Sequence, residues 1–227
     1  MALMVRRYDE DTLEPEFRAA ALRERIVLGT RETDYVRLHG AIVAAAELHP
    51  FSVALESIYL PALVQIGADW DADITTVAAE HLASNAIRSH LLPRTASPVE
   101  GRMRLAAMCL PGEQHDIGLI GTASLLTAAD WHVMMLGRDT PLDGLAAAVQ
   151  QIEAVAVVVS SLFEENARLH LATLAELNRT APVIVGGAGF DRILATVAGA
   201  GLRYADSPGA ALVLCEALRT THPMPRG

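Results

Sequence analysis

The sequence is poor in residues that mark several protein classes. Aromatic residues make up 4% of the 227 residues, although 52% are hydrophobic, so alanine, leucine and valine supply the apolar mass. That composition favours helices and buried parallel strands. The only cysteines, Cys109 and Cys215, stand in separate apolar runs without paired spacing. This argues against a disulfide framework, and we expect both to be reduced core residues of a cytoplasmic protein.

Positive charge is also scarce. The formal net charge is −9, and the basic residues are scattered along the chain. A surface that binds nucleic acid needs clustered cations, so we expect no direct DNA binding. The N-terminus does not have the shape of a signal peptide, and no apolar run approaches the ~18 residues that span a bilayer. We therefore expect no association with a membrane.

The chain changes character at residues 93–101, "PRTASPVEG", where prolines, glycine and small polar residues predict a linker. Before it, apolar residues recur at helical spacing in residues 18–29, 33–48, 52–70 and 74–92. Thr75 and Thr76 are candidate caps for the last of these helices. Short connections between four helices predict a four-helix bundle over residues 14–95.

After the linker, strand-like and helix-like segments alternate. Apolar runs of strand length occupy residues 104–110, 131–137, 154–161, 182–187 and 202–206, and helical spacing follows each run. Strands that are apolar on both faces are typical of a parallel sheet covered by helices. The fold class is thus α/β with an N-terminal all-α part. We predict a flavodoxin-like, Rossmann-type domain with a five-stranded parallel sheet over residues 101–222.

One histidine lies on the loop after the first predicted strand, in "LPGEQHDIGLIG", residues 110–121. Doubly wound sheets bind ligands at the carboxyl ends of their strands, where His115 falls. Glu113 can accept a hydrogen bond from one imidazole nitrogen, which fixes the tautomer and strengthens the other nitrogen as a metal donor. Gly118 leaves room where a side chain would block a bulky ligand. The alternative is an ordinary surface histidine.

Two later stretches end at the same edge of the predicted sheet. Ser160 closes the third strand, and Gly186 and Gly187 follow the fourth. Taken alone, the serine is equally a helix cap and the glycine pair a turn. Together with the loop they give E-x-H-x-x-G, 41 intervening residues, S-x-L at Ser160–Leu162, 23 intervening residues, and G-G.

This constellation resembles the cobalamin-binding domain of the base-off, His-on type, which carries D/E-x-H-x-x-G, S-x-L and GG at similar distances. The resemblance implies that His115 is the lower axial ligand of cobalt and that Glu113 is its hydrogen-bonding partner. It also implies that the nucleotide tail of the cofactor enters the domain beside the serine and the glycine pair. The motif positions implied to bind the cofactor are Glu113, His115, Asp116, Ile117, Gly118, Ser160, Leu162, Gly186 and Gly187.

The helical part has a motif of its own. Trp70 is followed, after nine residues, by the pair Glu80–His81. Alone, such a tryptophan is more often core and such a pair a solvated face. The spacing resembles the W-x9-E-H pattern of adenosylcobalamin photoreceptors of the CarH/LitR type. The resemblance implies that Trp70 packs on the adenosyl group, that Val77 lines its pocket, and that Glu80 and His81 bond around the ribose and the corrin edge.

In that family the bundle caps the upper face of the corrin, and light breaks the cobalt–carbon bond, which moves the bundle. Two departures matter. About 20 residues precede the first helix, so we do not expect the family's MerR-type DNA-binding domain. Asp71 stands where many relatives have a histidine after the tryptophan, which excludes a bis-histidine photoproduct formed at that position. His81 or water are the alternatives.

These features predict a stand-alone cobalamin-binding light sensor rather than an enzyme. We expect adenosylcobalamin as cofactor, an unidentified protein as signalling partner, and a homodimer or higher homo-oligomer. Stand-alone relatives, the photocobilins, also hold a bilin, so biliverdin is a candidate second chromophore. Two alternatives stay open: a corrinoid carrier of methyl groups between methyltransferases, and a cobalamin-binding regulator without photochemistry. Preference for methylcobalamin would favour the carrier.

Overall fold

The structure is a computed structural model that describes residues 14–96 and 103–220. The chain divides into two compact units, residues 1–90 and residues 91–227. Much of the predicted linker at 93–101, and the predicted domain ends at residues 101 and 222, lie outside the described residues. The part of the linker that is described contains a short 3-10 helix, η3 (Leu92–Thr95).

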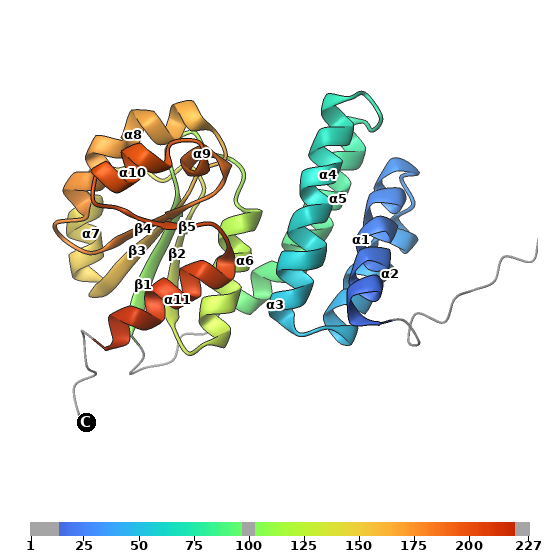
Figure 1. Ribbon diagram of the computed structural model, residues 1–227, viewed down its shortest axis with the longest axis horizontal. Coiled ribbons are helices and arrows are strands. Elements are labelled where there is room, and N and C mark those ends of the chain that lie inside the picture. The colour runs from blue at the N-terminus through green and yellow to red at the C-terminus, as the bar shows by residue number, and fades with distance from the viewer. Residues whose placement is uncertain (1–13, 97–102, 221–227) are drawn as a thin grey trace, which may run out of the picture. The chain divides into compact units, whose positions relative to one another are not determined.

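All regular elements among the described residues of the first unit are helices, in agreement with the predicted all-α part (Figure 1). Asp34 caps the second helix through its side chain, and Thr76 caps the last, because its hydroxyl accepts from the amide of Ala79 at 3.2 Å. The elements are α1 (Pro15–Arg31), α2 (Tyr35–Leu48), α3 (Phe51–Val53), η2 (Ala54–Tyr59), α4 (Leu60–Asp71) and α5 (Val77–Leu91).

A proline interrupts the third predicted helix without ending it. Pro61 has no amide hydrogen, and its ring would clash with the carbonyl four residues earlier in a regular α-helix. The turn before it, η2, is a π-helix, and the amide of Leu60 donates to the carbonyl of Leu55, five residues back. The wider turn places Tyr59 in the core, where its hydroxyl donates to the carbonyl of Ile42 at 2.8 Å.

Among the described residues, one continuous helical segment, Phe51–Asp71, is long and apolar enough to cross a membrane by length and composition, with a mean hydropathy of 1.4. It is not an uninterrupted apolar run, because Glu56, Gln65 and Asp69 lie within it. Asp69 is buried and forms a bidentate ion pair with Arg31 of α1, at 2.7 and 2.9 Å. The segment therefore packs as a helix of this unit.

The second unit contains a five-stranded, all-parallel sheet in the order β2-β1-β3-β4-β5. This is the flavodoxin-like order, so the predicted fold is confirmed. The strands are apolar and mostly buried, as the sequence indicated, because helices cover both faces. Their bounds are β1 (Arg104–Cys109), β2 (His132–Gly137), β3 (Ala154–Ser160), β4 (Val183–Gly186) and β5 (Arg203–Ala205).

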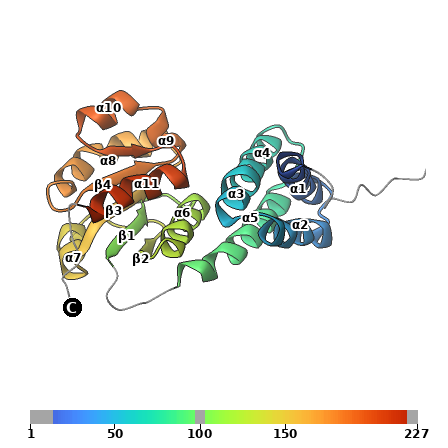
Figure 2. The same cartoon turned by 60° about the horizontal axis from the view of Figure 1, so that its bottom comes forward.

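Helices lie on both faces of the sheet (Figures 1 and 2), and each face has its own hydrophobic core. Helices α6 (Ile117–Ala128) and α11 (Pro208–Arg219) cover one face, and both cysteines lie in that core as free, buried thiols. Burial raises the pKa of Cys109 and of Cys215 to about 12, so neither is a thiolate at neutral pH. The other face packs against α7 (Leu145–Gln151), α8 (Glu164–Leu177), α9 (Ala188–Asp191) and α10 (Leu194–Gly199).

The register of the strands brings three loops to one edge. Cys109 at the end of β1 pairs with Ser160 of β3, which pairs with Gly186 of β4. The chain leaves β1 and β3 toward opposite faces, so the topological switch point of the sheet lies between these two strands.

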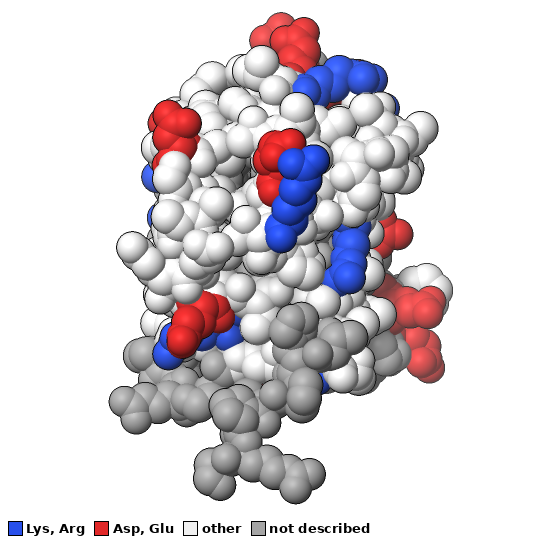
Figure 3. Space-filling model, turned by 90° about the vertical axis from the view of Figure 1, so that its left-hand side faces the viewer, with Lys and Arg blue, Asp and Glu red and all other residues white. Residues whose placement is uncertain are grey.

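On the face shown in Figure 3, acidic and basic side chains are scattered and lie beside one another.

Candidate functional site

The loop between β1 and α6, residues 110–116, forms the centre of the site. It turns away from the strand at Gly112, whose φ of +77° is the left-handed conformation that glycine adopts without strain. The next residue, Glu113, is fully buried. His115 follows on the surface, with 57% of its side chain exposed. The loop therefore buries a carboxylate directly behind an exposed imidazole.

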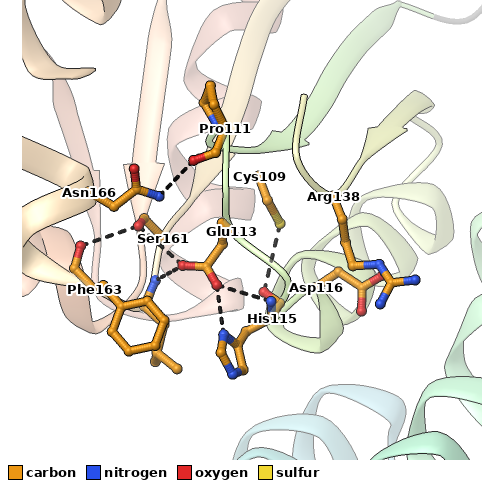
Figure 4. Close-up of polar contacts among 10 residues, drawn as sticks. Cys109, Pro111, Glu113, His115, Asp116, Arg138, Ser161, Phe163 and Asn166 are labelled. Atoms are coloured by element: carbon orange, nitrogen blue, oxygen red, sulfur yellow. Dashed lines mark hydrogen bonds and ion pairs between the residues drawn. The ribbon is translucent and has the colours of Figure 1, made fainter. Parts of the chain in front are cut away.

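The carboxylate of Glu113 accepts four hydrogen bonds (Figure 4). Its Oε1 accepts from the backbone amide of His115 at 3.0 Å and lies 2.7 Å from Nδ1 of the same residue. Its Oε2 accepts from the amide of Leu162 at 2.8 Å and from the hydroxyl of Ser161 at 3.3 Å. Glu113 thus joins the loop after β1 to the loop after β3, across the switch point.

These bonds keep the carboxyl ionised. Burial by itself raises the pKa of Glu113, but the donors from Leu162 and His115 outweigh it and hold the pKa below its ordinary value. An ionised carboxylate can only accept, so Nδ1 of His115 must carry its proton toward Glu113. The neutral ring then has its lone pair on Nε2, which points away from the carboxylate (Figure 4). The arrangement presents an oriented imidazole donor at the surface.

The surroundings of the imidazole are apolar on one side. The ring of Phe163 meets that of His115 edge to face, with centroids 5.3 Å apart. Phe163 is 52% exposed and Leu162 is 41% exposed, so both offer apolar surface on the loop after β3. Gly118, in the first turn of α6, has no atom within 4 Å of an added Cβ. A large, flat ligand would find room and apolar contact here.

The serine and glycine positions of the motif serve the architecture of this edge. Ser160 ends β3, and the neighbouring Ser161 is the residue whose hydroxyl reaches Glu113. Gly187 has a φ of +96°, and an added Cβ would lie 2.5 Å from the carbonyl oxygen of Ser161. A Cβ added at Gly186 would lie 3.0 Å from the carbonyl oxygen of Ala205. The glycines allow backbone segments of this chain to pass close together.

The remaining motif positions start α6. Asp116 is buried and immediately precedes the helix, with Oδ2 3.5 Å from Nε of Arg138. Ile117 is half-buried. All nine motif positions therefore lie at the carboxyl ends of β3 and β4, on the loops after β1, β3 and β4, or in the first turn of α6. Whether they bind a cofactor stays a prediction.

Three further residues hold these loops together and were not predicted: Arg138, Asp139 and Asn166. The amide of Asn166 in α8 donates to the carbonyl of Pro111 at 3.1 Å. Arg138 and Asp139 follow β2, the neighbour of β1. Their signal in the sequence was their place at a strand's carboxyl end, but only the strand order shows that they reach the His115 loop.

The second motif lies in the first unit, at the turn from α4 to α5. Trp70 is 49% exposed, which excludes the alternative of a core tryptophan. Val77, the first residue of α5, is also 49% exposed, and Ile74 between them is 57% exposed. The turn thus presents three large apolar side chains. The carbonyl of Asp69 holds it by accepting from the amides of Ile74 at 2.8 Å and Thr75 at 3.3 Å.

Polar groups follow on the next turn of α5. The carboxylate of Glu80 lies 3.5 Å from Nε2 of His81 and accepts from the hydroxyl of Ser84. His81 is exposed, whereas Glu80 is largely covered. In the described part of the chain, no group of three or more His, Cys, Asp or Glu residues could hold a metal ion. A metal at His115 would therefore bring its other ligands with it.

Comparison with known proteins places the chain. It is 30% identical over 175 residues to the HTH-type transcriptional repressor CarH of Myxococcus xanthus, and the alignment covers 75% of this chain and 58% of CarH. The chain is homologous to CarH. A second repressor of the same organism, CarA, is also 30% identical over 175 residues, which are 75% of this chain and 59% of CarA. The CarH-type resemblance seen in the motifs is thereby confirmed.

The similarity to the two repressors covers only part of their length. The chain spans less than two thirds of either repressor, and no family model matches it. Among solved structures, the monomethylamine corrinoid protein of Methanosarcina barkeri superposes with a TM-score of 0.71 at 15% identity, over 88% of this chain and 99% of that protein. This likeness shows that the CarH homologue has the same fold, a helical part followed by a parallel α/β sheet.

Proposed function

We propose that this CarH homologue is a cobalamin-binding light sensor that holds adenosylcobalamin base-off, with His115 as the lower ligand of cobalt. The observation that carries the proposal is the buried, ionised Glu113 bonded to Nδ1 of an exposed His115. That pair stands at the switch point of a flavodoxin-like sheet, where such folds bind ligands. Homology to CarH and the fold shared with a corrinoid protein support it.

The donor set fits the cofactor. A corrin supplies four nitrogen ligands of its own, so the protein needs to provide one further donor, and a neutral imidazole nitrogen suits cobalt. Glu113 orients that donor and increases its basicity, as carboxylates behind metal-bound histidines do. Leu162 and Phe163 offer apolar surface for the macrocycle, and the open space at Gly118 leaves room for it. Asp116 and Ile117 complete this face of the site.

The nucleotide tail of a base-off cofactor must leave the face that holds the cobalt. We place it along the carboxyl ends of β3 and β4, beside Ser160, Leu162, Gly186 and Gly187. The left-handed backbone of Gly187 keeps the two loops close together there. These residues would hold the tail through backbone groups, because glycine leaves the amides uncovered.

The first unit would cover the upper face of the cofactor. Trp70 and Val77 offer apolar surface for the adenosyl group, and Glu80 and His81 offer hydrogen-bonding groups for its ribose. When bound, adenosylcobalamin supplies a photolabile cobalt–carbon bond. Loss of the adenosyl group would remove the partner of the apolar turn at Trp70, and the helical unit would then relax.

The response leads to signalling rather than to catalysis. We propose a cytoplasmic, non-enzymatic protein that forms a homodimer or higher homo-oligomer and acts on a partner protein, without DNA binding by its two described units. Asp71 after Trp70 predicts a photoproduct whose upper ligand is His81 or water. Biliverdin is the candidate second chromophore, on the resemblance to the photocobilins.

The test is an absorbance titration with adenosylcobalamin in the dark, followed by green light. We expect base-off binding, an irreversible spectral change on illumination, and a change in oligomeric state by light scattering. A stronger preference for methylcobalamin would favour the methyl carrier. Binding with only the free cofactor's photolysis, and no change in the protein, would favour a regulator without photochemistry.

A further inference from the structure

The loop between β2 and α7, which begins at Arg138, lies against the His115 loop through backbone and side-chain hydrogen bonds. Oδ1 of Asp139 accepts from the amide of Gly112 at 2.6 Å. The amide of Asp139 donates to the carbonyl of Glu113 at 3.1 Å. The amide of the following residue, Thr140, donates to the carbonyl of Cys109 at 3.3 Å. These bonds fix the backbone of the His115 loop on both sides of Gly112.

The backbone conformation of Asp139 allows both of its contacts with the loop. Its φ is +48°, a left-handed conformation that is uncommon for residues with a side chain. Aspartate and asparagine tolerate this conformation better than most residues. In this conformation the residue turns its carboxylate to Gly112 and its amide to Glu113. One residue therefore both donates to the loop and accepts from it.

Glu113 is thus anchored at two places. Its carboxylate is held by the β3 side of the site, through the amide of Leu162 and the hydroxyl of Ser161. Its backbone is held by the β2 side, through Asp139. Because β2 and β3 flank β1, the two sets of hydrogen bonds hold Glu113 from the two strands on either side of β1. Loss of the Asp139 carboxylate would release the amide of Gly112, at the turn that leads into Glu113, and would leave the backbone bond from Asp139 to Glu113 as the remaining contact of this residue with the loop.

We propose that Asp139 is a positioning residue for the imidazole of His115. It fixes the backbone of Gly112 and Glu113, Glu113 fixes the proton on Nδ1, and Nε2 is thereby aimed outward as the donor. Arg138 secures the far end of the same loop through Asp116. The inference deepens the proposed function and rests on it for the cofactor. Its first prediction concerns the protein without cofactor.

The first measurement is the tautomer of His115 in the cofactor-free protein, from the nitrogen chemical shifts of its ring. In the wild type we expect Nδ1 to carry the proton. In Asp139→Ala we expect the share of the other tautomer to rise by up to about tenfold, because the lost bond from the amide of Gly112 is one charge-assisted hydrogen bond and its free energy is the upper limit of what can reach the ring. The exposed Asp143 lies on the same loop, so Asp143→Ala is the matched control and should match the wild type.

Two further variants separate positioning from strain. Asp139→Asn keeps an acceptor oxygen and tolerates the positive φ, so it should restore the wild-type tautomer. Asp139→Gly removes the acceptor and favours the positive φ, so it should fold at least as well as the alanine variant and still show the mixed tautomers. If Asp139→Ala and Asp139→Gly both fold and both keep the wild-type tautomer, the proposal is wrong.

The second measurement adds adenosylcobalamin. We expect Asp139→Ala and Asp139→Gly to bind it at least tenfold more weakly than the wild type, with asparagine restoring binding. If no variant, including the wild type, binds the cofactor but the tautomer shifts as expected, the positioning role stands and the cobalamin proposal fails. If the wild type binds and the alanine and glycine variants bind equally well, the positioning role is wrong.

Discussion

Replacing Glu113 by glutamine tests the electrostatic core of the site, because the two side chains have the same shape. The carboxylate accepts from two backbone amides, one imidazole and one hydroxyl. An amide has one acceptor oxygen and one NH2 group. With its oxygen toward His115, its NH2 faces the amide of Leu162, and two donors then meet. The hydroxyl of Ser161 can rotate to accept, but a backbone amide cannot.

The expected loss of stability in Glu113→Gln follows from the hydrogen bonds that the variant cannot form. The variant loses one charge-assisted hydrogen bond and leaves one buried amide unpaired, which together cost about 2–4 kcal/mol of unfolding free energy. For a chain of this size that lowers the melting temperature by about 5–15 °C. Trp131 is buried in the second unit and Trp70 lies in the first, and the chain has no other tryptophan. Unfolding in a Trp70→Phe background, followed by fluorescence, therefore reports the second unit.

The pH dependence supplies the sharper test. The folded pKa of Glu113 lies below its ordinary value of 4.5, so the stability that its charge contributes is complete above that value and is lost as the pH falls through the lower folded pKa. The gap between wild type and Glu113→Gln should be full at neutral pH and should shrink in acid. Glu176→Gln, at an exposed ion pair, should change stability by less than ~0.5 kcal/mol. A gap that is absent at neutral pH, or independent of pH, would refute the reasoning.

Two further predictions concern the frame of each unit. Gly187→Ala should lower the free energy of unfolding by about 2 kcal/mol or more, because its Cβ would lie 2.5 Å from the carbonyl oxygen of Ser161 at a φ of +96°. Gly118→Ala should keep the free energy of unfolding or raise it by up to ~1 kcal/mol. The same variant should weaken cobalamin binding about tenfold. Arg31→Met should destabilise the helical unit by about 2–4 kcal/mol, since it leaves the buried charge of Asp69 without its cation.

The controls and readouts of these variants are direct. Thermal melts by circular dichroism report stability, and absorbance titrations report binding. Arg37→Met removes two exposed ion pairs in the same unit, with Glu32 and with Asp34, and should cost less than ~0.5 kcal/mol. The account of the helical unit fails if Arg31→Met and Arg37→Met are equally stable. The account of the glycines fails if Gly118→Ala unfolds and Gly187→Ala does not.

Most of the fold follows from hydrophobic pattern alone. The strands of the second unit are apolar on both faces, which predicts a covered parallel sheet. The alternation of segments predicted a helical region after each strand, although two short helices, α9 and α10, follow β4 where the pattern indicated one. The sequence pattern did not predict the π-helical turn before Pro61, because a proline in a helical pattern indicates either an end or a distortion. Packing of Tyr59 against Ile42 decides between them.

The sequence predicted the central pair of the site but not the contacts that hold this pair in place. Glu113 and His115 are two residues apart on one loop, so their contact is local and could be read from spacing. Ser161 and Asp139 reach the same loop from 48 and 26 residues away in sequence. Their contacts depend on strand order and register, which no local pattern specifies. The sequence analysis chose Ser160 from the motif, whereas the hydroxyl bonded to Glu113 belongs to its neighbour.

The most direct test of the central claim asks which nitrogen binds cobalt. The cob(II)alamin complex of the protein, prepared with histidine carrying the heavy nitrogen isotope, is measured by electron paramagnetic resonance. If His115 is the lower ligand, the axial nitrogen splitting changes from the triplet of ordinary protein to a doublet, and His115→Ala loses the doublet. A triplet that persists in labelled protein, from the cofactor's own base, would contradict the account.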